Sequence, residues 1–117
     1  MTGATNYHAG LAAEDIAERL YTAQGAELLA RRFRAGAGEV DLIVRLAGTL
    51  VFVEVKARKT LEDASVSISA KQWARIAATA LGYLQHENLS LDTPMRFDVV
   101  LVDRAGGAEI IEDAMPR

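Results

Sequence analysis

Residues 38–58 (GEVDLIVRLAGTLVFVEVKAR) contain two short apolar runs separated by a break at Ala47 and Gly48. Runs rich in Val, Ile and Leu on both sides of a Gly-containing break are typical of a β-hairpin. Each run also carries acidic residues, among them Asp41 in the first and Glu54 in the second. Strands rarely place carboxylates within apolar runs, so this hairpin constrains both the fold and the chemistry of the chain.

The length of the break decides which residues of the two strands face each other. A loop of two or four residues gives a single register, which places Asp41 across from Glu54 and Glu39 across from Lys56. A three-residue loop would turn Asp41 away from Glu54, and we favour the even loop. Directly opposed residues have Cβ atoms about 4.5–5.5 Å apart, and like charges placed so are destabilising. Such a pair of carboxylates needs a compensating cation.

A divalent cation suits two opposed carboxylates. Mg²⁺ binds oxygen ligands and is often held by only one or two carboxylates together with waters and substrate phosphates. Lys56 follows Glu54 by two residues and shares its strand face, where an ammonium can hold a water or offset charge on a phosphate. The alternative is a simple cross-strand ion pair between Glu39 and Lys56, which would add little stability.

The remaining sequence predicts elements that would surround this hairpin. Apolar periodicity and turn residues predict a helix over 8–24 ended by Gly25, a strand over 26–33, and a turn over 34–38. Residues 59–68 show no period and are expected to form a loop. A second helix follows a Ser-x-x-Gln capping box at 69–72, with Trp73 in its buried stripe, and strands are expected over 95–102 and 108–111.

Glu14 is the one acid of the first helix that lies near its apolar stripe. The stripe consists of Ala13, Ile16, Ala17 and Leu20. At about 100° of rotation per residue, Glu14 falls roughly 60° beyond Ala17, at the margin of the surface that the helix covers. Glu14 could therefore reach a site beneath the helix. The alternative is a solvated carboxylate near the favourable N-terminal end of the helix dipole.

Composition limits the class of protein. A chain of 117 residues fits one domain, here 1–117 with a core of about 8–112, and the absence of cysteine excludes disulfides and thiolate metal sites. No apolar run approaches the roughly 20 residues that span a bilayer, and the N-terminus lacks the pattern of a secretory signal, so we expect a cytoplasmic protein without a membrane partner.

Charge is unevenly distributed along the chain. The net charge is −3, which argues against bulk electrostatic attraction to nucleic acid. Residues 31–75 nevertheless hold nine basic against five acidic residues, and they include the unusual acids. This basic middle segment favours a transient encounter with nucleic acid, or a homodimer that joins two such segments into one groove.

Four blocks of the sequence resemble a known family. They are GLAAEDIA at 10–17, GEVDLI at 38–43, VFVEVKAR at 51–58 and RFDVV at 96–100. An Asp on one strand followed by Glu-Val-Lys on the next resembles the PD-(D/E)XK nuclease core, with Val40 in place of the Pro. The four blocks in this order are similar to the bacterial YraN-like family (UPF0102), over about residues 10–102. Phe33 departs from the polar residue expected there.

The resemblance implies a fold and a set of functional residues. The fold is a restriction-endonuclease-like αβββαβ core, a mixed sheet flanked by helices, similar to archaeal Holliday junction resolvases. The implied catalytic residues are Glu14, Asp41, Glu54 and Lys56.

From the residues and the resemblance together we expect a metal-dependent DNA endonuclease, with branched DNA among its candidate substrates. Asp41, Glu54 and the Val55 carbonyl would hold Mg²⁺ or Mn²⁺, Lys56 would position the water, and Glu14 would complete the acidic cluster directly or through water. The expected phosphate contacts are Arg31, Arg34, Arg58 and Lys71. Lys71 is preferred to Gln72 because capping competes for Gln72, and Asp98 is expected to pair with an arginine. The alternative function is a non-catalytic nucleic-acid- or partner-binding domain that retains a nuclease fold.

Overall fold

The computed structural model describes residues 3–36, 38–58 and 68–116, with side chains from residue 12 onwards. Its elements are α1 (Gly3–Ala23), β1 (Glu27–Ala35), β2 (Gly38–Leu46), β3 (Thr49–Ala57), α2 (Ala70–His86), β4 (Met95–Val102) and β5 (Ala108–Ile111). This is the expected αβββαβ order, extended by the short final strand. The expected loop over 59–68 lies outside the described residues, except for Ile68.

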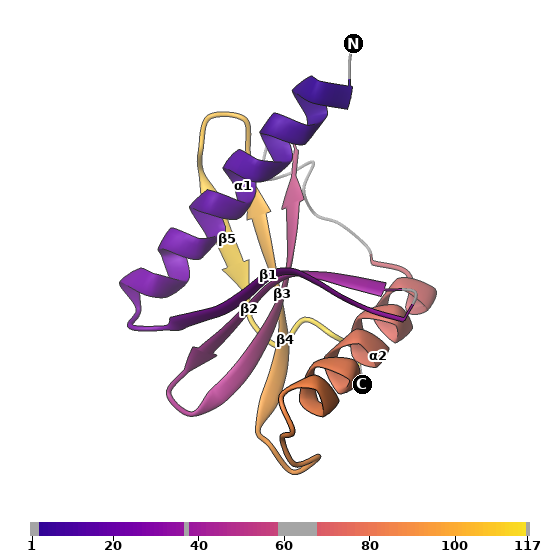
Figure 1. Cartoon of the computed structure of the whole chain (residues 1–117). Helices are drawn as coiled ribbons and strands as arrows, with labels where there is room; N and C mark the ends of the chain where they lie inside the picture. The colour runs from indigo at the N-terminus through magenta and orange to yellow at the C-terminus, as the bar shows by residue number, and fades with distance from the viewer. Residues whose placement is uncertain (1–2, 37, 59–67, 117) are drawn as a thin grey trace.

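The strands form one mixed sheet in the order β1-β2-β3-β4-β5. Only the β3–β4 pair is parallel among the described strands, because α2 provides the crossover between them. Figure 1 shows how strongly the sheet twists: β1 and β2 run across the direction of β4 and β5. Right-handed strand twist, accumulated over several strands, has this effect.

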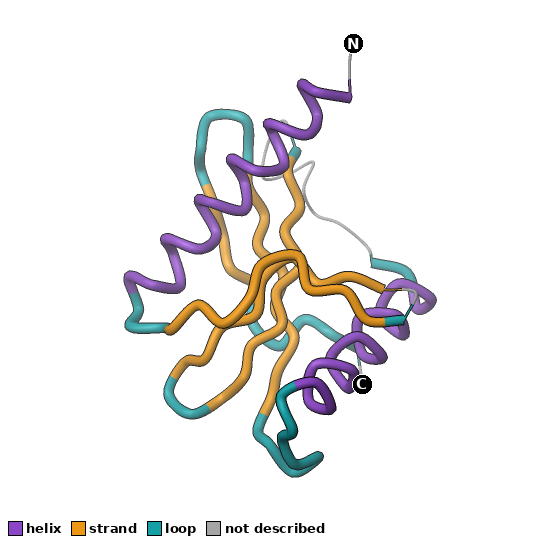
Figure 2. Tube along the Cα trace, in the orientation of Figure 1, coloured by secondary structure: helices purple, strands orange, loops and turns teal. Residues whose placement is uncertain are grey.

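Each face of the sheet is covered by one helix (Figure 2), and each face has its own apolar core. On the α1 face, Ala13, Ala17 and Tyr21 pack against valines and leucines of β2, β3 and β4. On the α2 face, Trp73, Ile76, Ala80, Tyr83 and Leu84 pack against the opposite sides of the same strands. Trp73 is only 7% exposed, which confirms it as a core residue.

The predicted hairpin register is confirmed. Leu46 pairs with Thr49, and the same register continues to Leu42 opposite Val53. The two-residue turn has Ala47 at φ 51° and Gly48 at φ 82°. Two consecutive positive φ values are what a type I′ turn requires, and this turn matches the twist of the paired strands.

Regular pairing of β2 with β3 ends at Leu42 and Val53. Beyond them, β3 runs beside β4 while the first residues of β2 lie towards α2 (Figure 1). Val40 belongs to the α2 core together with Ile43, whereas Leu42 belongs to the α1 core. Because a regular strand would place Val40 and Leu42 on one face, the pleat is irregular at Asp41, between them.

Glu39 and Lys56 are not paired as the sequence led us to expect. Once β2 leaves β3, Glu39 pairs with Arg34 of β1, and its carboxylate accepts a hydrogen bond from Arg34 Nε at 2.6 Å. Lys56 instead lies 3.3 Å from Glu54. The alternative of a cross-strand ion pair between Glu39 and Lys56 is therefore wrong, because it requires β2 and β3 to stay paired to their ends and they part beyond Leu42 and Val53.

The first helix begins earlier than predicted, at Gly3, and ends as predicted before Gly25, which has φ 90°. Its buried stripe is centred on Ala13, Ala17 and Tyr21, and Glu14 is only 6% exposed. Glu14 lies in the middle of α1, away from its N-terminal turn. The interpretation of Glu14 as a solvated carboxylate favoured by the helix dipole is therefore wrong.

Asp98 of β4 links α1 and the C-terminal segment to the sheet by hydrogen bonds. Its side chain is fully buried and accepts hydrogen bonds from Tyr21 Oη at 2.8 Å, Arg96 Nε at 3.1 Å and the Asp113 N–H at 3.0 Å. Burial beside this carboxylate raises the pKa of the Tyr21 hydroxyl, which stays protonated as the donor. The expected pairing of Asp98 with an arginine is confirmed.

Candidate metal centre and nucleic-acid interface

Asp41 and Glu54 come together where β2 parts from β3. The Val55 N–H donates to Asp41 Oδ2 at 2.7 Å, which ties the irregular position in β2 to the next strand. Burial, the negative charge of Glu54 and a side-chain hydrogen bond with Glu54 raise the pKa of Asp41 to about 7, and the charge of Glu14 adds to this. The Val55 N–H opposes the rise. The two carboxyl groups thus interact, although Asp41 and Glu54 lie beyond the last paired residues of β2 and β3, Leu42 and Val53.

Two side chains hold Glu54, whose own side chain is 12% exposed. Lys56 Nζ lies 3.3 Å from Glu54 Oε2, and Gln72 Nε2 donates to the same oxygen at 3.0 Å. An ammonium and an amide that converge on one carboxylate oxygen fix its direction. Glu54 is therefore oriented before any ligand arrives.

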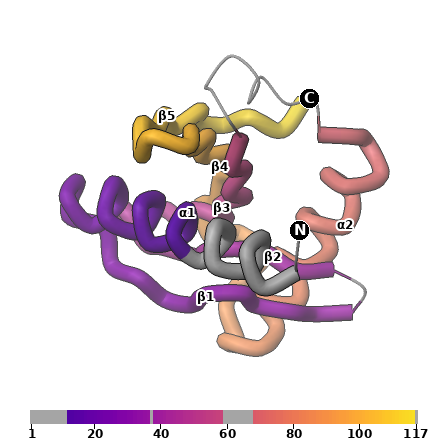
Figure 3. Tube along the Cα trace, turned by 90° about the horizontal axis from the view of Figure 1, so that it is seen from above, coloured from indigo at the N-terminus to yellow at the C-terminus, as the bar shows by residue number. Residues whose placement is uncertain are grey.

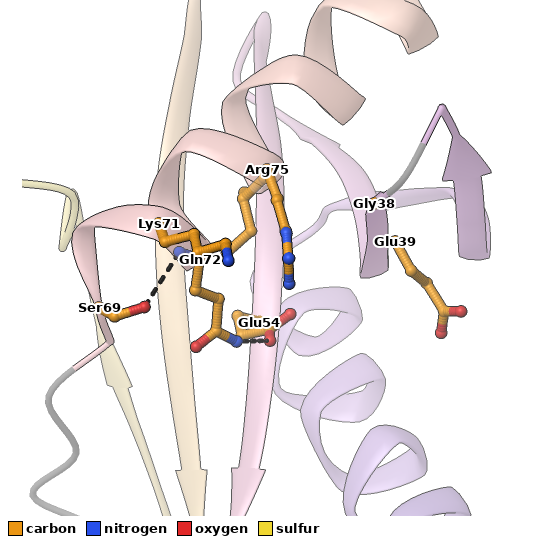
Figure 4. Close-up of a pocket in the computed structure, with 8 residues that line it drawn as sticks. Gly38, Glu39, Glu54, Ser69, Lys71, Gln72 and Arg75 are labelled. Atoms are coloured by element: carbon orange, nitrogen blue, oxygen red, sulfur yellow. Dashed lines mark hydrogen bonds between the residues drawn. The ribbon is translucent and has the colours of Figure 1, made fainter.

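Gln72 was assigned to the wrong duty by sequence reasoning. Ser69 is the N-cap of α2, and its hydroxyl accepts from the Gln72 backbone N–H at 3.1 Å, as a capping box predicts. The Gln72 side chain does not complete that box; it turns into the site and reaches Glu54 (Figure 4). Only the tertiary packing of α2 on β3 makes this partner available.

Glu14 is held by two arginines of β1. Arg32 donates from Nε to Glu14 Oε1 at 3.0 Å and from Nη2 to Oε2 at 3.1 Å, and Arg31 Nη2 lies 3.3 Å from Oε1. Arg31 is also within hydrogen-bonding distance of Asp15 and Glu18. The structure therefore places Arg31, an expected phosphate contact, in an acidic cluster of α1.

Arg32 was not singled out from the sequence. In a regular strand it would point away from the face of Arg31, so the pattern gave no sign that both would reach α1. Its φ of 52° breaks the alternation and turns it to the same side.

The donor atoms at Asp41 fit a hard divalent cation. Asp41 and Glu54 provide carboxylate oxygens, and the carbonyl of Val55 is next to the amide that binds Asp41. Among the residues described from 12 onwards, no three His, Cys, Asp or Glu side chains are grouped as metal ligands. Two carboxylates and a carbonyl, completed by water, suit Mg²⁺ or Mn²⁺ rather than Zn²⁺.

A pocket of about 330 Å³ lies beside Glu54, between the start of β2 and the first turns of α2. It is lined by Gly38, Glu39, Glu54, Ser69, Lys71, Gln72, Arg75 and Ile76. Figure 4 shows the Arg75 side chain extending from α2 in the direction of Glu54, while Glu39 points away from both. Lys71 and Arg75 are exposed and make no ion pair with the described side chains. Arg75 is a candidate phosphate contact that was not singled out from the sequence.

Gly38 sets the distance between β2 and α2 at this pocket. A Cβ atom at Gly38 would overlap Thr79 Oγ1 and lie 2.9 Å from the carbonyl oxygen of Arg75. The strand start can approach the helix this closely only without a side chain, and the approach places Arg75 over the pocket. The Gly of the GEVD block therefore has a packing role.

The other two expected phosphate contacts lie at the ends of strands. Arg34 is 78% exposed in its side chain and bonded to Glu39 at 2.6 Å. Arg58 follows β3 directly, where its N–H donates to the Val102 carbonyl and its Nη1 donates to the Ala57 carbonyl at 2.7 Å. Both are on the surface, and neither contacts Asp41 or Glu54 in the described structure.

Seen from above in Figure 3, α1 and α2 lie at separate positions around the sheet, so Glu14 approaches the acids from one helix and Gln72 from the other. The structure therefore brings together Glu14, Asp41, Glu54 and Lys56, the four predicted catalytic residues, and adds Arg32 and Gln72 to them.

Comparison with known proteins agrees with this arrangement of motifs. The model of the uncharacterised protein family UPF0102 matches residues 13–102. A UPF0102 protein of Roseobacter denitrificans is 46% identical over 113 residues, which cover 97% of this chain and 88% of the relative. One of Ruegeria pomeroyi is 45% identical over 112 residues (96% and 91%), and one of Azorhizobium caulinodans is 46% identical over 105 residues (90% and 80%). The chain belongs to the uncharacterised protein family UPF0102.

Proposed function

We propose that this protein is a divalent-metal-dependent nuclease that hydrolyses phosphodiester bonds, with DNA as its substrate. The observation that supports the proposal most directly is the buried pair of Asp41 and Glu54: burial, followed by the charge of Glu54, raises the pKa of Asp41 to about 7. Two interacting carboxyl groups destabilise a fold unless something else is gained, and a bound cation is the natural gain. A site whose pKa is shifted by burial and by a charged neighbour is also a candidate functional site on general grounds.

Asp41, Glu54 and the Val55 carbonyl are the groups that would hold Mg²⁺ or Mn²⁺. The ion would supply activation of water and neutralisation of charge on the phosphate. Lys56 is on the same strand face as Glu54 and is 20% exposed in its side chain, so its ammonium can orient a water or face a phosphate oxygen. The 3.0 Å hydrogen bond from Gln72 fixes the orientation of the Glu54 carboxylate.

Lys71 and Arg75 are the cations best placed to meet the nucleic-acid backbone. Both line the pocket beside Glu54, and neither forms an ion pair with a carboxylate of the described residues. Arg34 and Arg58 extend the positive surface from the strand ends, whereas Arg31 is engaged with α1. Phosphate contacts of this kind position a substrate without reading its sequence, which suits an enzyme that recognises the shape of DNA.

The second candidate is a nucleic-acid- or partner-binding domain that has kept a nuclease fold without catalysis. It is favoured by one observation: the side chains described from residue 12 onwards contain no group of three metal-ligating residues. None of the described helices is long and apolar enough to cross a membrane. The homodimer that would join two basic segments into one groove stays a prediction, which the mass measured by sedimentation can test.

Cleavage and metal binding separate the two candidates. We expect wild type to bind Mn²⁺ in calorimetric titration and to cleave branched or single-stranded DNA only with Mg²⁺ or Mn²⁺, while Asp41→Asn loses both properties and Lys56→Gln loses cleavage alone. Absence of metal binding, or cleavage that survives in Asp41→Asn and Lys56→Gln, would remove the nuclease proposal. DNA binding that persists in these variants without any cleavage by wild type would favour the binding domain.

The phosphate contacts have a separate test. Lys71→Gln and Arg75→Gln should each weaken DNA binding and lower the slope of log affinity against log salt by about 1, measured without divalent metal. Arg45→Gln is the matched control, because Arg45 is an exposed β2 arginine paired with Glu27 at 3.1 Å. An unchanged salt slope in both pocket variants would contradict this binding surface.

A further inference from the structure

Arg32 has an unusual backbone for a residue inside a strand. Its φ of 52° is in the left-handed region, where residues other than Gly and a few short polar types are rare. Arg31 pairs with Leu42 and Phe33 pairs with Val40, so Arg32 lies opposite Asp41 in the register. The two irregular positions of neighbouring strands thus face each other. A residue held in the left-handed region inside a strand is a candidate functional residue, because backbone strain of this kind is concentrated at functional sites.

The irregular backbone directs the Arg32 guanidinium to the carboxylate of Glu14 on α1. Phe33 packs on the α2 side of the sheet, while both Arg31 and Arg32 reach Glu14 on the α1 side. Regular alternation would have sent one of these two arginines to the opposite face. The strained residue therefore adds a second cation to the α1 side of the sheet, where Glu14 lies.

Arg32 takes both oxygens of Glu14. Its Nε and Nη2 atoms lie 3.0 Å from Oε1 and 3.1 Å from Oε2, the parallel two-bond geometry in which arginine binds carboxylates most strongly. Arg31 Nη2 adds a contact of 3.3 Å to Oε1. Glu14 is only 6% exposed, so these partners replace the water that the carboxylate has lost.

The cations are unevenly shared among the acids of the site. Arg31 and Arg32 both contact the Glu14 carboxylate, whereas Glu54 is contacted by Lys56. The two guanidinium groups at Glu14 disfavour a divalent cation there by charge repulsion, so Asp41 and Glu54 are the carboxyl groups that would hold one.

We infer that Arg32 is a built-in cation that keeps Glu14 out of metal coordination, so that the cluster of Glu14, Asp41 and Glu54 takes one divalent ion rather than two. This inference rests on the proposed metal-dependent function and adds to it the number of ions and the role of Glu14. Glu14 is then a positioning residue. It binds Arg32, and its negative charge acts on Asp41 without direct contact with the metal. In the sites of many phosphoryl-transfer enzymes two ions lie about 3.5–4 Å apart, and here the guanidinium takes the place of one of them.

The experiment counts bound Mn²⁺ per chain by calorimetric titration and by electron paramagnetic resonance of the bound ion. Wild type should bind one ion. Arg32→Asn should bind two, because Asn tolerates the left-handed backbone and carries no charge, which leaves Glu14 able to ligate. Two adjacent Mn²⁺ ions would also broaden the resonance through their mutual coupling. Arg45→Gln, which removes a strand arginine far from the cluster, should bind one ion as wild type does.

A second arm keeps the test decisive if Arg32→Asn fails to fold. Glu14→Gln in the wild-type background should still bind one ion, because Glu14 is not one of the ligands of that ion. Adding Glu14→Gln to Arg32→Asn should return the count from two ions to one.

Each outcome has one meaning. Two ions in wild type, one ion in folded Arg32→Asn, or no bound ion in folded Glu14→Gln would overturn this inference and leave the nuclease proposal standing. No Mn²⁺ bound by wild type or by Arg32→Asn would overturn the proposed function, and this inference with it.

Discussion

Replacing Asp41 by Asn should make the metal-free protein more stable at alkaline pH. Burial and the neighbouring Glu54 raise the pKa of Asp41 from 3.8 to about 7. Above pH 7 the folded protein must therefore keep a carboxylate ionised in a place that disfavours its charge. Asn removes that charge and retains an oxygen that can accept the Val55 N–H, so the link between β2 and β3 is preserved.

The size of the effect follows from the two pKa values. Each pKa unit corresponds to about 1.4 kcal/mol, so a rise of roughly three units lowers the free energy of unfolding of wild type by up to about 4 kcal/mol above pH 7. The group's contribution to stability is fully present below the unfolded pKa and is lost as pH rises through the folded pKa. The difference between variant and wild type should therefore be small at pH 4 and reach its maximum at pH 8.

Urea unfolding with a chelator present, at pH 4, 6 and 8, measures this difference. We expect the free energy of unfolding of Asp41→Asn to exceed that of wild type increasingly from pH 4 to pH 8, while Glu109→Gln, an exposed change on β5, follows wild type at every pH. Addition of Mg²⁺ at pH 8 should stabilise wild type and leave the variant unchanged. A gain that is the same at pH 4 and pH 8, or a variant less stable than wild type at pH 8, would refute the reasoning.

Three further predictions test the surroundings of the site. Gly38→Ala should lower the free energy of unfolding by about 1–3 kcal/mol in urea, because the new Cβ overlaps Thr79 Oγ1; an unchanged midpoint would mean that α2 can move away. Asp98→Ala should lower it by about 3 kcal/mol, because Arg96 loses its fully buried partner, and a loss below about 1 kcal/mol would contradict the role of this network. Gln72→Ala should weaken Mn²⁺ binding in calorimetry by about tenfold or more while stability changes by less than about 1 kcal/mol; equal affinity would show that Gln72 does not orient Glu54.

Local signals in the sequence were enough for the hairpin. The Ala47-Gly48 break and the alternation of apolar residues predict an even loop of two or four residues, and either length gives the register that the structure has as far as Leu42 and Val53. The same register predicts that Asp41 and Glu54 come close, as they do. The Ser69 cap and the stop at Gly25 are likewise local, because each depends on a side chain or a backbone conformation within a few residues.

The parts of the site that sequence reasoning missed depend on departures from regular geometry. The pleat is irregular at Asp41 on β2, and Arg32, opposite it on β1, adopts a left-handed backbone. Both side-chain directions follow from these two positions, and a pattern of period two cannot reveal them. The same departure separated Glu39 from Lys56.

The contact of Gln72 with Glu54 and the place of Arg75 at the pocket were missed for a related reason. Sequence periodicity places both on α2, but it cannot say which turn of the helix lies over Glu54. That depends on the close approach of Gly38 to Thr79, a contact between residues far apart in the chain. A helix shifted by one turn would have the same periodicity and a different site.

The sequence by itself determined the order of elements and the hairpin register, and it predicted Glu14, Asp41, Glu54 and Lys56 as candidate site residues, because each follows from local spacing or from the motif blocks of the UPF0102 family. Tertiary structure alone decided which groups balance these charges. Arg32 contacts Glu14 because β1 is irregular at Arg32, and Gln72 contacts Glu54 because α2 packs on the sheet. Buried charges must be compensated by whatever groups the fold brings near, and those groups lie far away along the chain.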